Sequence, residues 1–147
     1  MENNQLKQLI DTSSRIILKV GSSLLINENN NDINYHWLKN FSKEIQSLTD
    51  KKKQIMIVSS GSVALGRKQL NLVKNLSLDE KQAAAAVGQI HLSHAWKEVL
   101  KSFNLESAQI LLAPDDTETR RKHLNARATL LKPVSYTHLR AHETMLH

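Results

Sequence analysis

The sequence predicts an α/β domain with a mainly parallel β-sheet that helices cover on both faces. Three strand-like runs recur along the chain, at residues 15–20, 55–60 and 107–113. A stretch with helical character follows each of them, and such alternation favours parallel pairing with helical crossovers. A chain of 147 residues is also long enough to bury a hydrophobic core.

The first third of the chain predicts a strand, a loop and a helix in that order. Residues 15–20, RIILKV, form a β-branched run that stops at Gly21, which indicates a buried strand ending in a tight turn. The asparagine-rich segment 26–34, INENNNDIN, is typical of a loop or hairpin. Apolar residues then recur at three- and four-residue steps, the pattern of an amphipathic helix: Trp37, Leu38, Phe41, Ile45 and Leu48.

The middle of the chain predicts a second strand and a long helix. Residues 55–60, IMIVSS, run directly into Gly61. Ser77 and Glu80 have the spacing of a capping box, so we expect a helix from about 79 to 103. Gly88 within that helix costs about 1 kcal/mol relative to alanine, which indicates a close approach of the helix to the sheet or to a neighbouring loop.

The last part predicts a third strand and a final helix before the pattern stops. Residues 107–113, SAQILLA, form the strand, and one of Asp115, Asp116 and Thr117 is expected to cap the helix. That helix would carry Arg120, Arg121, Leu124, Asn125 and Leu130. From Pro133 onward no periodicity remains, and three of the seven histidines follow it, His138, His142 and His147.

Composition limits the function classes. The chain has no cysteine, which excludes disulfides and thiolate chemistry within it. Its net charge of +6 suggests a polyanion partner, but aromatic residues are only 4%, so no base-stacking platform is expected and nucleic acid is not an expected partner. No apolar run is long enough to span a bilayer and the start does not resemble a secretory signal, so we expect a cytoplasmic protein without a membrane partner.

The candidate binding residues follow the first two strands. The segments LKVGSS and VSSGSVALG place small residues where backbone amides can approach an anion, although turns that need positive φ explain Gly21, Gly61 and Gly66 equally well. Lys19 is out of place in an apolar strand unless an anion lies at the strand end or its head group reaches water. The adjoining Gly-Ser-Ser favours a phosphate role for Lys19.

Other clusters are explained more simply by structure. His91 and His94 lie three residues apart but have no flanking ligand residues, which favours helix packing over a metal site, and no metal ligand is predicted. Asp115 and Asp116 fit helix capping better than magnesium binding. Ser60 has no histidine–acid partner in the sequence pattern, so a serine-hydrolase triad has no support.

Four segments together resemble the N-terminal part of the amino-acid kinase family. These are IILKVGSSLL, IMIVSSGSVALGRKQLNL, EKQAAAAVGQIHLSHAW and AQILLAPDDTETRRKHLNARATL, between Arg15 and about Leu131. The combination of KQAAAAVGQ with LNARATL is similar to the branch that phosphorylates the side-chain carboxylate of L-glutamate, the first step of proline biosynthesis. The resemblance implies a three-layer αβα sandwich, incomplete here, with ATP and Mg²⁺ as cofactors.

The resemblance also implies roles for single residues. Lys19 matches the catalytic lysine that binds ATP phosphates, and Gly21 and Ser22 match the phosphate-side turn. Ser60 and Gly61 match the substrate-binding turn, although this chain has serine after that glycine where the family commonly has alanine. The implied partners of the full-length protein are L-glutamate, further copies of the chain, and a reductase that accepts glutamyl 5-phosphate.

These observations divide the chain into three parts. Residues 1–14 are an N-terminal extension, 15–132 the N-terminal part of the kinase domain, and 133–147 a non-native tail. Within the tail, VSYTHLRAHET resembles an in-frame translation of a transposase-type sequencing adapter, so we expect no packed role from about 133 onward.

The acidic–asparagine loop and nucleotide-binding half of the family are not found, and we expect this polypeptide to be inactive. The alternatives are a non-catalytic anion-binding module or another member of the family.

Overall fold

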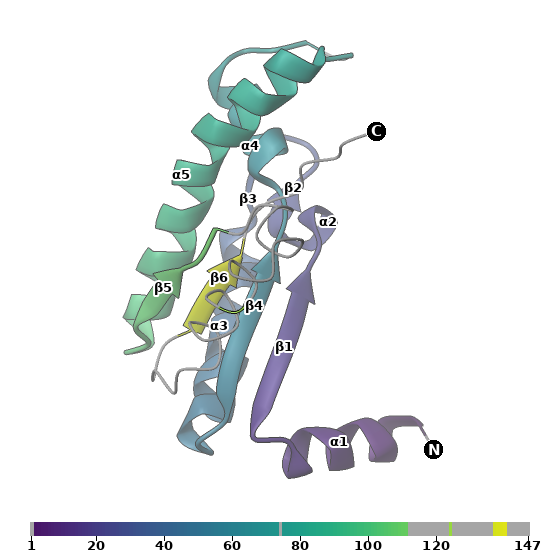
Figure 1. Cartoon of the computed structure of the whole chain (residues 1–147), viewed down its shortest axis with the longest axis vertical. Helices are drawn as coiled ribbons and strands as arrows, with labels where there is room; N and C mark the ends of the chain where they lie inside the picture. Colours follow the sequence, from purple (N-terminus) through teal and green to yellow (C-terminus); the bar gives the residue numbers. More distant parts are fainter. Residues whose placement is uncertain (1, 74, 112–123, 125–136, 141–147) are drawn as a thin grey trace.

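The computed structural model describes residues 2–73, 75–111, 124 and 137–140 (Figure 1). Its elements in chain order are α1 (Glu2–Thr12), β1 (Arg15–Val20), α2 (Ser22–Leu25), β2 (Ile26–Asn27), β3 (Asp32–Ile33), α3 (Tyr35–Asp50), β4 (Gln54–Ser59), α4 (Ser62–Gln69), α5 (Leu78–Ser102), β5 (Ser107–Gln109) and β6 (Thr137–Arg140).

The main sheet has four strands in the order β1-β4-β6-β5, and all three pairings are parallel. In the β1–β4 register Lys19 lies opposite Val58 and Val20 lies opposite Ser59. The carboxyl ends of these two strands therefore meet at one edge of the sheet, as Figure 1 shows. The predicted α/β class with a parallel sheet is confirmed.

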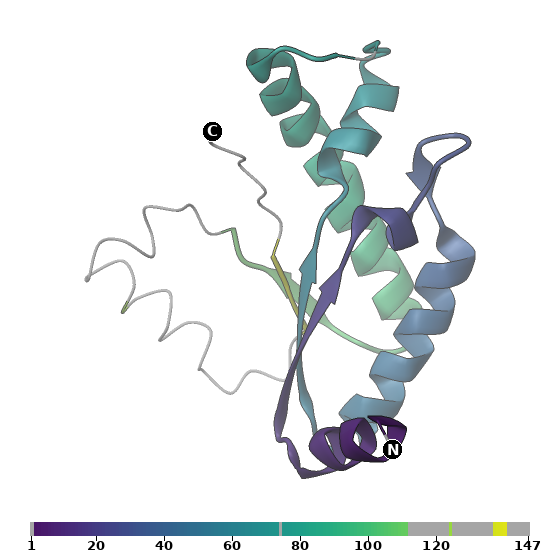
Figure 2. The same cartoon turned by 90° about the vertical axis from the view of Figure 1, so that its right-hand side faces the viewer.

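The core lies between one face of this sheet and two helices. Alternate residues of β4 point into it, with Ile55 4% and Ile57 0% exposed. Helices α3 and α5 cover this face (Figure 2), and they contribute fully buried side chains such as Leu38 and Trp96. This burial follows the apolar periodicity seen in the sequence, since β-strand side chains alternate between the two faces.

The opposite face of the sheet is open in the described part of the chain. Ile17 of β1 points to this face and is 63% exposed. The second helical layer of the expected sandwich is not seen among the described residues. The final helix predicted after residue 115 lies outside them, apart from Leu124.

The predicted helix start at Ser77 is confirmed in atomic detail. The Ser77 hydroxyl accepts a hydrogen bond from the Glu80 amide at 3.3 Å, and the Glu80 carboxylate accepts one from the Ser77 amide at 2.8 Å. These two bonds satisfy amide donors that a helix start leaves free. None of the described helices, including the 25 residues of α5, is long and apolar enough to cross a membrane.

Gly88 makes the close approach that its place in α5 predicts, and its neighbour is α4. A Cβ built on Gly88 would lie 1.8 Å from the carbonyl oxygen of Ser62, and one on Gly66 would lie 1.8 Å from that of Ala84. The two helices therefore cross with their backbones in contact. Both interpretations of Gly66, a positive-φ turn and an anion-binding turn, are wrong, because it lies inside α4 and serves this crossing.

Two segments near the ends of the chain contribute elements that the sequence patterns did not predict. The N-terminal extension forms α1, and the Lys53 ammonium donates to the carbonyls of Asp11 and Ser13 at 2.6 Å each. The expectation that residues from 133 lack a packed role is wrong for Thr137–Arg140, which form β6 between β4 and β5. Strand pairing uses backbone groups that every residue except proline possesses, so the non-native origin predicted for the tail would not prevent this pairing.

Candidate functional site

The turns that follow β1 and β4 lie side by side at the carboxyl edge of the sheet. The backbone amide of Ser60 donates to the Val20 carbonyl at 3.1 Å, and the Ser60 hydroxyl donates to the same oxygen at 3.4 Å. A Cβ built on Gly61 would lie 3.7 Å from Cβ of Ser22. The structure therefore brings together the two predicted site segments, which are 40 residues apart at Val20 and Ser60. We call residues 21–22 the first turn and residues 60–61 the second turn.

Gly61 is the residue of the second turn that requires glycine. Its φ is +121°, and a Cβ there would also meet the Ile26 side chain at 3.1 Å. Gly21, by contrast, has a φ of −74°, and a Cβ on it would come no closer than 3.8 Å to the Ser23 hydroxyl. The glycine pattern had two interpretations, a positive-φ turn and an anion site. The positive-φ turn is confirmed for Gly61 and not found at Gly21, where the backbone is open to close approach by a ligand.

The second turn is also the start of α4. Gly61 is the N-cap residue of this helix, and it has no side chain to bond the first free amides. The positive end of a helix dipole and unpaired amides both favour an anion at this place. The first turn leads into α2 in the same way, although that helix has only four residues.

Lys19 lies beside these turns but on the open face of the sheet. Its side chain is exposed, opposite Val58 in the register, and no hydrogen bond or ion pair is recorded for it among the described residues. This exposure fits the alternative in which the head group of Lys19 reaches water. An exposed ammonium at a strand end next to a glycine–serine turn is available to an anionic ligand without any cost of burial.

A buried tryptophan forms a hydrogen bond with Ser59, the residue just before the second turn, and the sequence did not indicate this contact. The indole nitrogen of Trp96, a residue 1% exposed, donates to the Ser59 hydroxyl at 3.2 Å. Phe41 packs edge-on against the indole with ring centroids 5.9 Å apart. The available signal was Ser59 itself, since a serine at the end of a buried strand needs a hydrogen-bond partner.

The histidines and acidic residues do not form a metal centre within the described ranges. No group of three His, Cys, Asp or Glu side chains there could hold a metal ion. His91 contacts Asp32 and Gln69 instead, while His94 is exposed. Asp115 and Asp116 lie outside the described residues.

Sequence comparison matches most of the chain to one protein family. Residues 14–139 match the amino acid kinase family. The glutamate 5-kinase of Paramagnetospirillum magneticum is 46% identical over 118 residues, which are 80% of this chain and 32% of the relative. The glutamate 5-kinase of Rhodopseudomonas palustris strain BisB5 is 49% identical over 123 residues, which are 83% of this chain and 33% of the relative. The chain thus spans about a third of the length of the curated relatives it matches.

Structural comparison gives the same fold at low sequence identity. A UMP kinase from Bacillus anthracis superimposes with a TM-score of 0.55 and 19% identity, covering 87% of this chain and 52% of the other. An isopentenyl phosphate kinase from T. acidophilum gives a TM-score of 0.53 and 11% identity, with 87% and 54% covered. At these identities the likeness concerns the fold alone.

Proposed function

The chain belongs to the amino acid kinase family, and from that premise we propose that its parent protein transfers the γ-phosphoryl group of ATP to the side-chain carboxylate of L-glutamate. The observation that carries the proposal is the position of the second turn at the carboxyl edge of the sheet, where Ser60 bonds the end of β1 and Gly61 lies beside Ser22 of the first turn. This is where open α/β sheets bind their ligands. The relatives named glutamate 5-kinase, at 46% and 49% identity, support glutamate as the acceptor.

The two turns suit two different anions. We assign the first turn and the Lys19 ammonium to the phosphates of ATP, because an exposed cation and uncrowded backbone amides stabilise phosphate oxygens. We assign Ser60 and Gly61 to the substrate, since the second turn presents a hydroxyl and the free amides at the start of α4. Their contact would hold donor and acceptor within reach of each other.

The proposed reaction requires these residues mainly to position the two ligands and to offset negative charge. A glutamate side chain has a reference pKa of about 4.3, so it is already an ionised nucleophile at neutral pH and needs no general base. Phosphoryl transfer then depends on aligning the two anions and offsetting the charge that spreads over the phosphoryl oxygens. Among the described residues, Lys19 could offset the charge on the phosphoryl oxygens.

Magnesium does not fit the described residues. Within those ranges no cluster of acidic or histidine side chains is suited to the ion, so we route no step through it. In kinases the ion bridges phosphate oxygens and neutralises charge. We therefore expect the protein ligands of magnesium to lie outside the described residues.

The 147 residues are proposed to bind ligands without turnover. An assay of ATP-dependent hydroxamate formation from glutamate and hydroxylamine tests this directly, and we expect no product from the purified chain. Measurable product would refute the proposed inactivity. Cytoplasmic location, self-association and the reductase partner of the full-length protein stay predictions.

Ligand titration separates the proposed function from its alternatives. We expect ATP to shift the NMR amide signals of residues 19–22 and glutamate to shift those of residues 60–62. A non-catalytic anion-binding module would respond to ATP but also equally to other polyanions, and a nucleic-acid binder would lose affinity steeply with salt. A chain that responds to oligonucleotides and not to ATP or glutamate would overturn the proposal.

A further inference from the structure

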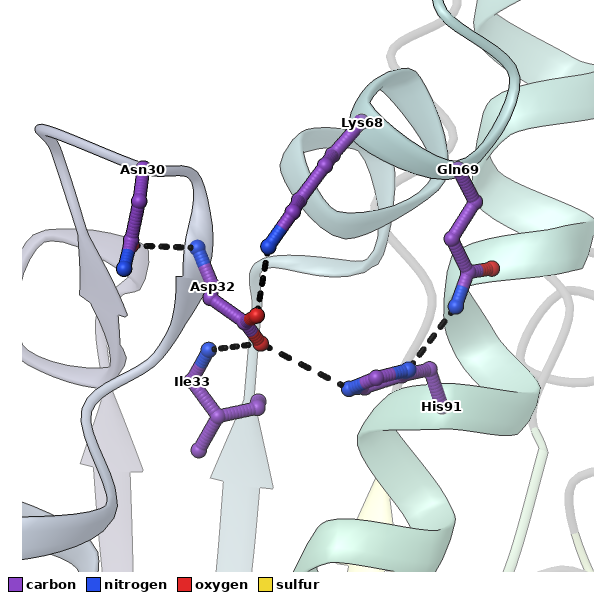
Figure 3. A network of polar contacts seen from close by, with 6 residues as sticks. All are labelled: Asn30, Asp32, Ile33, Lys68, Gln69 and His91. Atoms are coloured by element: carbon purple, nitrogen blue, oxygen red, sulfur yellow. Dashed lines mark hydrogen bonds and ion pairs between the residues drawn. The ribbon is translucent and has the colours of Figure 1, made fainter.

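A polar cluster away from the two turns joins three elements of the fold (Figure 3). The Asp32 carboxylate in β3 accepts a hydrogen bond from the Lys68 ammonium of α4 at 2.5 Å and lies 3.7 Å from Nε2 of His91 in α5. The side-chain nitrogen of Gln69 lies 2.8 Å from Nδ1 of the same imidazole. We call Asp32, Lys68, Gln69 and His91 the hairpin brace.

The loop that carries Asp32 fixes the direction of its carboxylate. The Asp32 amide donates to the side-chain oxygen of Asn30 at 3.0 Å, and the carboxylate itself accepts from the Ile33 amide at 2.8 Å. The hydrogen bond from Lys68 holds the pKa of Asp32 below its ordinary value of 3.8, so the group is ionised at neutral pH. Asp32 is thus held in place by its own hairpin and presents charge to both helices.

The hairpin brace connects the segments that carry the two turns. The β2–β3 hairpin follows the first turn through α2, and the Leu25 amide donates back to the Gly21 carbonyl at 3.4 Å. Lys68 belongs to α4, which begins at the second turn. Each strand of the hairpin has only two residues, and such a short ribbon does not hold a fixed position without outside contacts.

A second contact transmits the hairpin's position to the second turn. Ile26 of β2 is 5% exposed and packs against Gly61, where a Cβ would meet its Cγ1 at 3.1 Å. A hairpin that shifts relative to α4 therefore changes the space around Gly61. Because Ile26 pairs with Ile33, the neighbour of Asp32, the hairpin brace and this contact lie at the same level of the hairpin.

We propose that Asp32 is a positioning residue that acts through Lys68 and His91 to hold the first turn against the second. The ligands of the turns rest on the proposed function, whereas the positioning itself is a property of the fold. The side chains of Lys68 and Asp32 are 44% and 36% exposed. Such pairs contribute little to global stability, so the effect is expected in the local geometry of the turns.

Amide hydrogen exchange, followed by NMR on the full chain, tests the proposal. In Asp32→Asn we expect the Leu25 amide, bonded to Gly21, and the Leu65 amide, bonded to Gly61, to exchange about two- to fivefold faster, the size typical of an exposed ion pair. Glu28→Gln is the matched control, because it removes the same charge from the same hairpin at an exposed residue with no recorded ion pair in the described chain. It should leave both amides unchanged.

Substitutions at Lys68 test the same connection from the other side. Lys68→Met should reproduce the effect of Asp32→Asn, and Lys68→Arg should retain wild-type exchange, since it keeps a cation within reach of the carboxylate. Faster exchange confined to residues 30–34, or equal effects of Glu28→Gln and Asp32→Asn, would overturn the proposal. If Asp32→Asn does not fold, the two Lys68 variants decide in the same way.

An ATP titration of the same samples separates this proposal from the proposed function. If wild-type amides do not respond to ATP or glutamate while the exchange pattern holds, the ligand assignment fails and the positioning role stands. If the ligands bind and the exchange pattern is absent, the positioning role fails alone.

Discussion

Replacing Gly88 by alanine would insert a methyl group into the crossing of α4 and α5. The new Cβ would lie 1.8 Å from the Ser62 carbonyl oxygen and 2.6 Å from the Gly66 nitrogen. Both neighbours are backbone atoms, so no change of side-chain rotamer relieves the overlap. Since Cβ contacts below 3.0 Å essentially do not occur, α4 would have to move by at least about 1.2 Å.

The magnitude follows from two opposing effects. Overpacking of a close contact costs about 1–3 kcal/mol, and the upper end applies here because the obstacle is a rigid helix. Alanine gains about 1 kcal/mol over glycine in helix propensity. We therefore expect Gly88→Ala to lower the free energy of unfolding by about 2 kcal/mol. Ser62 follows Gly61 directly, so the same displacement should disturb the second turn.

Urea denaturation followed by circular dichroism measures this change. With a slope of about 2 kcal/mol per molar urea, the midpoint should fall by about 1 M. Gly21→Ala is the matched control, because its Cβ would meet nothing closer than 3.8 Å at a φ of −74°. A Gly88→Ala variant as stable as the wild type would refute the reasoning, since propensity would then outweigh the overlap.

Three further predictions concern single interactions. Trp96→Phe, which removes the donor to Ser59, should cost about 1 kcal/mol in urea denaturation; an unchanged midpoint would count against this bond. Because Lys68 lowers the pKa of Asp32, the stabilisation is present above pH 3.8 and lost as the pH falls through the folded pKa. The melting temperature of the wild type should therefore fall further on acidification than that of Lys68→Met, and parallel curves would contradict this. Lys19→Met should change stability by less than about 0.5 kcal/mol, because the side chain is exposed, while it weakens ATP binding several-fold by calorimetry; unchanged ATP affinity would remove Lys19 from the site.

Local patterns predicted the elements whose causes are local. The strand at 15–20 and the helix expected from about 79 to 103 were found as β1 (Arg15–Val20) and α5 (Leu78–Ser102). A β-branched run and a capping box depend on neighbouring residues, so the sequence displays them directly. The pairing of the two turns was also predictable, because parallel strands bring their carboxyl ends to one edge.

Long-range contacts account for what the sequence did not predict. Gly66 resembles a turn residue in its segment, and only the path of α5 shows that it serves a helix crossing. The sequence left open how Lys19 is accommodated in an apolar strand, and the structure shows that its face of the sheet is open in the described chain. The hairpin brace joins residues from β3, α4 and α5, and no spacing in the sequence connects Asp32 with His91.

The position of β6 determines when the sheet can be completed during synthesis. Met56 pairs with His138, 82 residues later in the chain, so the inner edge of β4 stays unpaired while all of α4, α5 and β5 leave the ribosome. Unpaired strand edges attract other chains, and pairing over such long separations is slow. The nascent chain therefore passes through a stage in which one edge of β4 and one edge of β5 are both unpaired, because both pair with β6. A translational pause before residue 137 would lengthen this stage and favour aggregation.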